Sequence, residues 1–183
     1  CGFAYRDSVF KRTPDGFVVL AVTFRLVPGG AAGVRYAELR RALADEPAPS
    51  LERVRQTVLA LRRSKSMVID PGDDNRRSAG SFFTNPIVDD AVADALVRAA
   101  VDTGLVASAE AVPRWPAGPG RSKLAAGWLI ERAGVTRGMR RGAVGVSSRH
   151  ALALVHHGGG TTGELLALAR EIRAAVRDRF GVT

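Results

Sequence analysis

The segment Gly80-Ser81-Phe82-Phe83-Thr84-Asn85-Pro86 follows a loop that contains Asp-Pro-Gly-Asp-Asp-Asn and leads into a predicted helix. The helix is expected because Val92, Leu96 and Ala99 recur at helical spacing. Gly104 is expected to end it. On this pattern alone, the serine of the segment would cap the helix, because serine side chains readily accept hydrogen bonds from the free amides at a helix start.

Another helix and two short strands are expected farther along the chain. Residues 122–133 predict a helix, with Ser122 as its cap and Gly134 as its end. The strands are expected near residues 143–147 and 150–156.

The last helix has the clearest start signal in the sequence. Thr161 and Glu164 form the pattern of a capping box, in which each side chain bonds a backbone amide at the helix start. The predicted core stripe of this helix is Leu165, Leu168, Ile172, Val176 and Phe180. Because helices and strands alternate irregularly along the chain, we expect an α+β fold.

The N-terminal residues 3–27 are expected to form a β-hairpin, because the turn signal Thr13-Pro14-Asp15-Gly16 separates two extended runs. The second run, residues 17–27, is apolar almost without interruption, which is typical of a strand covered on both faces. Part of that cover is expected upstream of Cys1.

Two helices are expected between the hairpin and the central loop. A short helix or turn is predicted at residues 34–46 around Tyr36. A firmer helix is predicted from Leu51 to Arg63, with Ser50 as its cap. Its apolar stripe is Leu51, Val54, Val58 and Leu61.

The net charge of +9 is compatible with a nucleic acid, a membrane surface or an anionic small molecule as partner. Of the 27 basic residues 24 are Arg, the total less Lys11, Lys65 and Lys123, and no dense basic run occurs. We therefore expect no nucleic-acid partner. No apolar run of roughly 18 residues occurs, so no membrane span is expected. A single cysteine indicates a reducing cytoplasm and no metal site.

Three segments together resemble signature stretches of the UDP-N-acetylenolpyruvoylglucosamine reductase family. They are Tyr5-Arg6-Asp7-Ser8-Val9-Phe10-Lys11, the segment from Gly80 to Pro86, and Lys123-Leu124-Ala125-Ala126-Gly127-Trp128-Leu129-Ile130. They occur in the order that the family has, and the resemblance runs from the first residue of the chain to the last. The Gly-Ser-Phe-Phe-x-Asn-Pro run is the most specific of the three.

The resemblance implies a cytoplasmic reductase that uses NADPH and FAD. In this family NADPH reduces bound FAD, and the flavin then passes hydride to the enolpyruvyl ether of UDP-N-acetylenolpyruvoylglucosamine. Protonation of the resulting carbanion gives UDP-N-acetylmuramate, a peptidoglycan precursor. Residues 1–69 are then the C-terminal remainder of the FAD-binding lobe, with a substrate-covering tyrosine loop. Residues 70–183 are then the substrate-binding C-terminal domain.

The same resemblance implies a partner within the same polypeptide. The N-terminal FAD-binding half is expected ahead of Cys1, and a catalytic glutamate is expected just beyond Thr183. We therefore expect that this chain alone neither holds FAD tightly nor turns over.

The resemblance assigns catalytic roles to two residues. Ser81 is implied to be the proton donor, and Arg6 is implied to face the substrate carboxylate. Tyr5 and Gly80 are implied to lie beside the flavin, Gly80 because glycine lets the backbone come close. A simpler interpretation of Arg6 is a surface ion pair with Asp7, worth under about 1 kcal/mol.

The implied substrate contacts are Tyr36, Lys65, Asn85, Lys123, Arg62, Trp115 and Arg137. Trp115 and Arg137 stand where the family has a tyrosine and a lysine that contact the UDP moiety. Lys123 has separate support, because a cation at the start of a helix is unfavourable unless an anion lies nearby. Arg62 and Lys65 could instead complement the dipole at the end of their helix.

Three histidines, His150, His156 and His157, show no metal-ligand spacing and are interpreted as structural or exposed. Two alternatives to the reductase stay open. One is a non-catalytic module that binds a UDP-sugar or another anion. The other is a basic nucleic-acid-binding domain, which ranks last because aromatic residues for stacking are only 6% of the sequence.

Overall fold

The computed structural model describes residues 2–4 and 6–183. Cys1 and Tyr5 lie outside the described residues, so the predicted flavin contact of Tyr5 stays a prediction. By compactness the chain divides into two units, Cys1–Gly33 and Val34–Thr183. Each unit is described by itself below.

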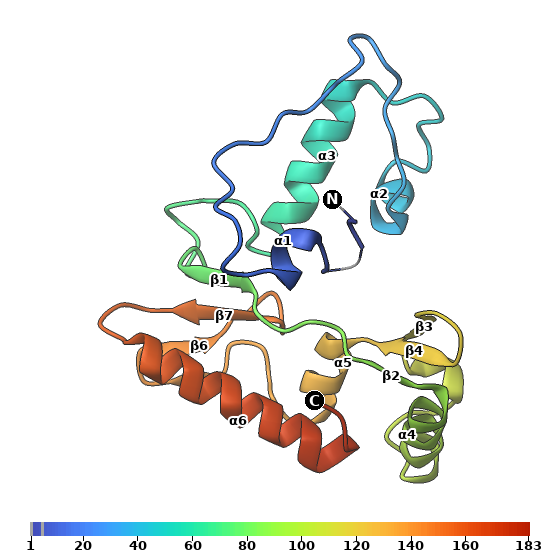
Figure 1. Ribbon diagram of the computed structural model, residues 1–183, viewed down its shortest axis with the longest axis vertical. Helices are drawn as coiled ribbons and strands as arrows, with labels where there is room; N and C mark the ends of the chain where they lie inside the picture. Colours follow the sequence, from blue (N-terminus) through green and yellow to red (C-terminus); the bar gives the residue numbers. More distant parts are fainter. Residues whose placement is uncertain (1, 5) are drawn as a thin grey trace. The chain divides into compact units, whose positions relative to one another are not determined.

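The second unit contains nearly all the regular structure of the described chain (Figure 1). In chain order its elements are α2 (Ala37–Ala42), α3 (Leu51–Arg63), β1 (Ser78–Ser81), β2 (Ile87–Asp89), α4 (Asp90–Asp102), the 3₁₀ turn η1 (Ala109–Ala111), β3 (Arg114–Pro116), β4 (Arg121–Leu124), α5 (Ala126–Arg132), β5 (Arg140–Arg141), β6 (Val144–Val146), β7 (Ala153–His156) and α6 (Thr162–Phe180).

These strands form two antiparallel sheets. One has the order β1-β7-β6-β5 and the other the order β2-β4-β3. The helix α6 contacts β6, β7 and α5, and α4 contacts β2 and β4. Helices packed on antiparallel sheets make an α+β fold, so the predicted fold class is confirmed.

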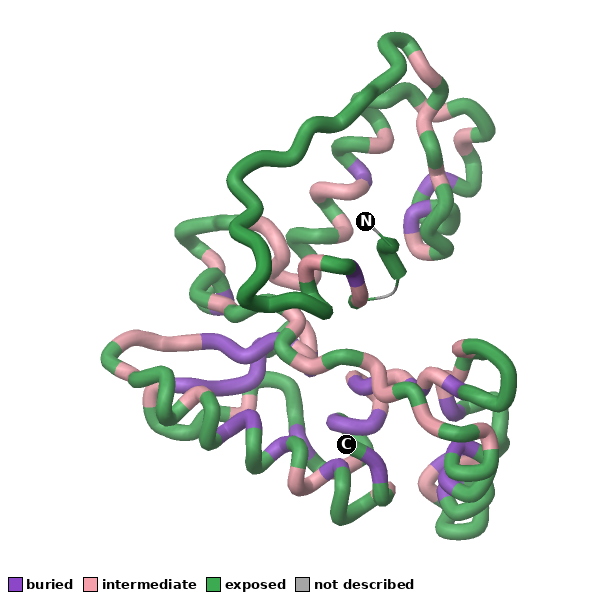
Figure 2. Tube along the Cα trace, viewed as in Figure 1, coloured by how far each residue is buried: buried purple, intermediate pink, exposed green. Residues whose placement is uncertain are grey.

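The core of the second unit lies between β6, β7, α5 and α6, where Figure 2 shows most of the buried positions. Aliphatic side chains from the sheet and the helices fill it. Its most completely buried side chains are Leu124, Leu129, Leu154, Leu168, Ile172, Val144 and Val146.

Several predicted elements are confirmed. The helix α3 has the predicted bounds, and the Ser50 side chain accepts a hydrogen bond from the Arg53 amide at 3.1 Å. The helix α6 begins with the predicted capping box of Thr161 and Glu164, and Leu168 and Ile172 of its stripe are buried. The short helix beside Tyr36 and the strands β6 and β7 also lie where they were predicted.

The predicted hairpin over residues 3–27 is wrong. The short helix α1 (Val9–Arg12) occupies the first half, and residues 17–27 form no strand (Figure 1). A strand needs a neighbour for its amides and carbonyls, and the described residues of this unit pair only through a single bridge between Ala4 and Asp7. The apolar run is consequently open to solvent, with Leu20 91% exposed.

The predicted helix over residues 122–133 starts too early. Residues 121–124 form the strand β4, and α5 begins only at Ala126. The strand forms because its backbone pairs with β2 on one side and with β3 on the other. Lys123 is therefore not at a helix start, so the helix dipole gives no reason to expect an anion beside it. Gly134, with φ of +90°, does follow the helix as predicted.

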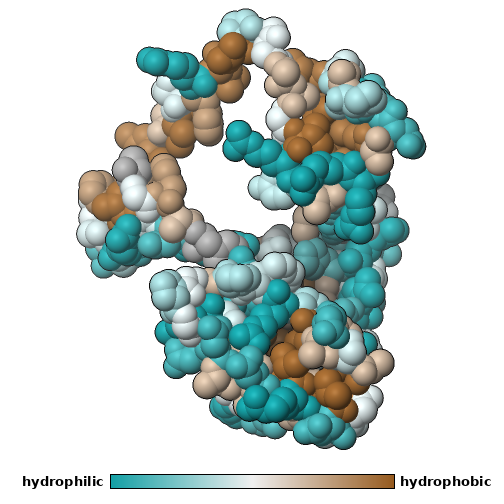
Figure 3. Space-filling model, turned by 90° about the vertical axis from the view of Figure 1, so that its right-hand side faces the viewer, coloured by the Kyte–Doolittle hydropathy of each residue, from teal (hydrophilic) through white to brown (hydrophobic). Residues whose placement is uncertain are grey.

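The predicted stripe of α4 is rotated by one residue. The buried positions are Ala93, Leu96 and Ala100, whereas Val92 and Ala99 are exposed. They line an open apolar groove of about 540 Å³ near the end of α6, and Figure 3 shows apolar surface over α4. Helical spacing predicts this helix correctly. It does not determine which side of the helix faces the sheet, because neighbouring residues such as Val92 and Ala93 are both apolar.

The packing of α6 predicts which of its side chains stabilise the fold. Ile172→Ala removes a completely buried side chain and should lower the free energy of unfolding by about 2–5 kcal/mol. The matched control Leu166→Ala, on the exposed side of the same helix, should lower it by about 1 kcal/mol or less. Equal losses in chemical denaturation would contradict the described packing.

Candidate functional site

Ser81 lies at a bulge in the pairing of β1 with β7. Ser78 pairs with Val155 and Ser81 with Ala153, so three steps along β1 face two along β7. Gly80, inside the bulge, has φ of +72°, a conformation that only glycine adopts without strain. A Cβ added to Gly80 would meet nothing within 4 Å, so backbone conformation and not space requires glycine there.

The Ser81 side chain is half-buried, and its hydroxyl makes no hydrogen bond with any residue that the structure describes. It does not cap a helix, because α4 begins only at Asp90 and its N-cap is Asp89. The interpretation of Ser81 as a helix cap is therefore wrong. At this bulge, no described residue accepts a hydrogen bond from the Ser81 hydroxyl.

His150 is held close to the Ser81 strand through Leu152. The Phe82 amide donates to the Leu152 carbonyl at 2.8 Å, and the Leu152 amide donates to His150 Nδ1 at 3.1 Å. Because Nδ1 accepts this bond, the proton of the neutral imidazole lies on Nε2.

Burial lowers the pKa of half-buried His150, and the positive charges of Lys65 and Arg137 lower it further. The negative charge of Glu131 opposes this shift. Lys65 lies far in the sequence from Glu131 and Arg137, which pair with each other at the end of α5. The sequence alone indicates no functional role for His150, because the charged residues around it are brought together only by the fold.

Lys65 and Arg137, both predicted substrate contacts, therefore both lower the pKa of the same histidine, His150. Each has a carboxylate partner: Lys65 pairs with Glu38 of α2, and Arg137 Nε lies 2.8 Å from Glu131 Oε1. An anionic ligand at this place would compete with those two carboxylates for the same cations.

The two other predicted contacts in this region have different surroundings. Arg62 Nη2 donates to the Met67 carbonyl at 3.0 Å, so it closes the turn after α3. Tyr36 stands at the N-cap position of α2, makes no side-chain capping bond, and is 80% exposed. Tyr36 is consequently available to a ligand, whereas Arg62 is already used by its own loop.

Trp115 and Lys123 lie side by side on adjacent strands of the three-stranded sheet. They are a directly opposed pair of β3 and β4, and Lys123 Nζ lies 5.9 Å from the centre of the Trp115 ring. This is within the range of a cation–π interaction. Ile87 of β2 is opposite Lys123 on the other side, so the three side chains form one row on one face of the sheet.

Asn85, just ahead of β2, is tied to α5. Its Oδ1 accepts a hydrogen bond from the Ala126 amide at 2.9 Å. The residue at the N-cap of α5, Ala125, has no side chain that could do this. Asn85 thus satisfies a free amide at the start of α5, and its predicted contact with substrate stays a prediction.

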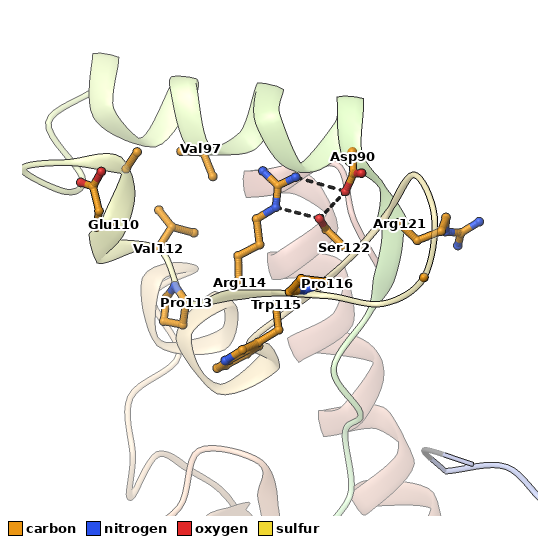
Figure 4. Close-up of a pocket in the computed structure, with 12 residues that line it drawn as sticks. Asp90, Val97, Glu110, Val112, Pro113, Arg114, Trp115, Pro116, Arg121 and Ser122 are labelled. Atoms are coloured by element: carbon orange, nitrogen blue, oxygen red, sulfur yellow. Dashed lines mark hydrogen bonds and ion pairs between the residues drawn. The ribbon is translucent and has the colours of Figure 1, made fainter. Parts of the chain in front are cut away.

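A hollow of about 630 Å³ lies on the α4 side of the three-stranded sheet. Arg114 fills its floor: Nε donates to Ser122 Oγ at 2.7 Å, Nη2 lies 3.1 Å from Asp90 Oδ1, and Nη1 pairs with Asp94. Hydrogen bonds from Ser122 and Arg114 lower the pKa of Asp90. In Figure 4 the Trp115 ring points away from this network.

This arrangement follows from the alternation of side chains along a strand, which puts Arg114 and Trp115 on opposite faces. The Arg114 network braces α4 against the sheet, whereas the side chains of Trp115 and Lys123 belong to the other face. Of the predicted binding residues, Trp115 alone is among those that line this hollow.

Arg6 lies in the first unit, within a turn closed by two backbone hydrogen bonds between Ala4 and Asp7. Its φ of +55° is unusual for a residue with a side chain and costs on the order of 1 kcal/mol or more. Asp7 pairs with Arg12 at 3.4 Å, so the simpler interpretation of an Arg6–Asp7 pair is wrong. Arg6 has no ion pair with any described residue. Whether it meets Ser81 stays a prediction.

No group of three or more His, Cys, Asp or Glu side chains could hold a metal ion among residues 2–4 and 6–183. Of the helices in that part of the chain, none has the length and apolar character to cross a bilayer.

The second unit is thus an α+β domain that gathers cations around a half-buried histidine, beside a serine with no described partner. The profile described as "UDP-N-acetylenolpyruvoylglucosamine reductase, C-terminal domain" matches residues 70–183. The chain belongs to this family, as the three sequence segments suggested. The predicted boundary between residues 69 and 70 as the edge of a flavin lobe stays a prediction.

Relatives with the name UDP-N-acetylenolpyruvoylglucosamine reductase match the chain over its full length. The protein of Thermobifida fusca (strain YX) is 50% identical over 187 residues, which cover 100% of this chain and 51% of that protein. The protein of Streptomyces avermitilis is 49% identical with the same coverage, and that of Ralstonia nicotianae is 46% identical and covered to 50%. The chain spans about half the length of these curated relatives.

The surroundings of His150 predict how stability depends on pH. The lowered pKa means that the folded state resists a proton that the unfolded state takes up below about pH 6.5. Stability should therefore be complete above that pH and fall as the pH decreases below it. His150→Asn keeps an acceptor for the Leu152 amide and should weaken this fall.

The measurement is the free energy of unfolding at pH 7.5 and at pH 5.5. Some pH dependence should remain in the variant, because burial also lowers the pKa of His157. Identical slopes for the wild type and His150→Asn would show that His150 does not resist protonation.

Proposed function

We propose that this chain supplies the proton donor and much of the substrate site of a cytoplasmic reductase that uses NADPH and FAD. The reaction is the reduction of UDP-N-acetylenolpyruvoylglucosamine to UDP-N-acetylmuramate for peptidoglycan synthesis. The N-terminal FAD-binding half of the same polypeptide is the partner. The observation that carries the proposal is the half-buried Ser81 hydroxyl, which lacks a described partner at a glycine bulge in the segment most specific to the family.

The proton-donor role fits the chemistry of a serine hydroxyl. A hydroxyl is a poor acid near neutral pH, so it protonates only a strongly basic acceptor. The carbanion beside the substrate carboxylate is such an acceptor. Under these conditions placement within hydrogen-bond reach matters more than adjustment of the pKa. The bulge supports such placement, because it fixes the direction of Ser81 relative to β7.

Arg6 is assigned to the substrate carboxylate, on which negative charge increases during hydride transfer. A guanidinium holds a carboxylate with two parallel hydrogen bonds. Stabilisation of this type is worth about 3 kcal/mol per donor in other enzymes. The left-handed backbone of Arg6 and its lack of a described ion-pair partner support a role outside simple folding.

The described residues fit the reactive ring of a flavin better than its diphosphate. FAD, when bound, supplies the hydride. The open space beside Gly80 leaves room for a flat ring near Ser81. The glycine-rich Gly158–Gly160 ahead of α6 is no phosphate cradle, because it folds around His156. The Gly158 amide donates to His156 Nδ1 at 3.2 Å, and Nε2, which then carries the proton, donates to the Gly160 carbonyl at 3.0 Å. The capping box occupies the start of α6. We therefore assign tight flavin binding to the other half of the polypeptide.

The substrate diphosphate and uridine are assigned to two groups of side chains. Lys65 and Arg137, whose positive charges both act on His150, provide positive charge for phosphate oxygens. Lys123 and Trp115 provide a cation next to an aromatic face, a combination that suits a nucleotide base and its phosphate. Tyr36, exposed at the start of α2, is assigned to cover the bound substrate.

Ser81→Ala in the full-length protein tests the proton-donor role. Reduction of the flavin by NADPH should be unchanged, and reduction of the substrate should slow by about 100-fold or more. The control Thr84→Ala, an exposed position in the same segment, should leave both steps within about twofold. Stopped-flow absorbance of the flavin follows each half-reaction. Equal slowing of both steps by Ser81→Ala would contradict the role.

Trp115→Ala tests the assigned nucleotide contact. The apparent KM for the UDP-sugar should rise by about tenfold with little change in kcat, because a stacked base contributes about 1–3 kcal/mol to binding. Trp115→Phe, which keeps an aromatic face, should restore most of the affinity. Steady-state kinetics with an unchanged KM for Trp115→Ala would remove this residue from the site.

A further inference from the structure

Asn75 is a buried polar residue that joins two segments far apart in the sequence. It is 5% exposed. Its Oδ1 accepts a hydrogen bond from the Ser148 amide at 2.9 Å. Its Nδ2 donates to Ser148 Oγ at 3.1 Å, Asp73 Oδ1 at 3.1 Å and Ser66 Oγ at 3.3 Å. These four residues, Ser66, Asp73, Asn75 and Ser148, are called the Asn75 cluster below.

A buried amide with both its oxygen and its nitrogen engaged tolerates little movement of its partners, because a lost bond would leave a polar atom buried and unpaired. The Asn75 cluster therefore fixes the turn after α3 relative to the connection between β6 and β7.

The first segment places Lys65. Ser66 follows it directly and has φ of +56°, a left-handed conformation that is uncommon for a residue with a side chain. The hydroxyl of Ser66 is bonded within the cluster, to Asn75 and to Asp73. These bonds hold Ser66 in its unusual conformation, and the direction in which the chain presents Lys65 depends on it.

The second segment places His150. Ser148 precedes it by two residues and binds Asn75 through both its amide and its hydroxyl. The positive charges of Lys65 and Arg137 both act on His150, so all three groups lie in one neighbourhood. The cluster thus connects the two segments that bring Lys65 and His150 together.

We infer that Asn75 is a positioning residue for the substrate diphosphate: it fixes Lys65 against His150 and Arg137, so that their donors meet one doubly charged group. This inference rests on the proposed function, which assigns Lys65 to the diphosphate. Asn75 acts through Lys65 and does not itself touch the ligand.

A purely structural role would have a different signature. If Asn75 only stabilised its loop, its loss would lower the melting temperature but would leave substrate affinity unchanged in the protein that stays folded. Positioning predicts a raised KM at temperatures where the variant is fully folded. It also predicts that the effect depends on the presence of Lys65, because one residue acts through the other.

The experiment uses the full-length protein, NADPH and UDP-N-acetylenolpyruvoylglucosamine. Asn75→Ala should raise the apparent KM for the UDP-sugar by about tenfold and leave kcat within about twofold. Asp74→Ala, at an exposed position in the same loop, is the control and should change neither. In the background of Lys65→Ala, the further change Asn75→Ala should raise the KM by less than about twofold.

Ser66→Gly keeps the test decisive if Asn75→Ala does not fold. Glycine accepts the left-handed backbone but lacks the hydroxyl, so the KM should rise severalfold without loss of the folded state. An unchanged KM for the folded variants, or a full tenfold effect of Asn75→Ala without Lys65, would overturn the inference. If the wild type does not reduce this substrate at all, the proposed function fails instead, so the two failures are distinguishable.

Discussion

The bulged pairing of β1 with β7 is the constraint on which the proposed site depends. A regular ladder would turn alternate side chains to opposite faces, and the extra residue at Gly80 changes that alternation just before Ser81. The same pairing joins the Ser81 segment to Leu152 and, through it, to His150. A serine in this place therefore has a direction set by backbone hydrogen bonds and not by its own rotamer alone.

The second feature of the site is that cationic side chains in it are paired with carboxylates that a ligand can replace. Lys65, Arg137 and Lys123 come from three separate segments. Lys65 pairs with Glu38, and Arg137 pairs with Glu131. Such pairs at half-exposed positions contribute little to stability. A doubly charged diphosphate can replace those carboxylates at small cost, which is consistent with a site that binds and releases its ligand.

The sequence predicted the elements with strong local signals and missed those that depend on distant partners. The capping box at Thr161 and the Ser50 cap fixed two helix starts, because these contacts lie within one turn. The sequence predicts the start of a helix where the structure has the strand β4, because a strand of so few residues shows no periodicity of its own. The apolar run after Gly16 predicted a strand, but no described neighbour pairs with it.

The candidate site shows the same division. Motif resemblance makes Ser81 and Lys65 candidate site residues, but nothing in their spacing indicates His150 or Asn75. Those two residues acquire their significance from hydrogen bonds and charges between segments that only the fold brings together. The row of Trp115 and Lys123 likewise depends on strand register, which sequence patterns do not give for strands this short.

The central claim is that the Ser81 hydroxyl delivers a proton to a substrate carbanion whose carboxylate Arg6 holds. The most direct measurement is a crystal structure of the full-length protein with FAD and the UDP-sugar bound. The account predicts Ser81 Oγ at roughly 2.6–3.2 Å from the position that receives the proton, with the Arg6 guanidinium on the carboxylate. A bound substrate whose enolpyruvyl group lies out of reach of Ser81, or whose carboxylate lies apart from Arg6, would contradict it.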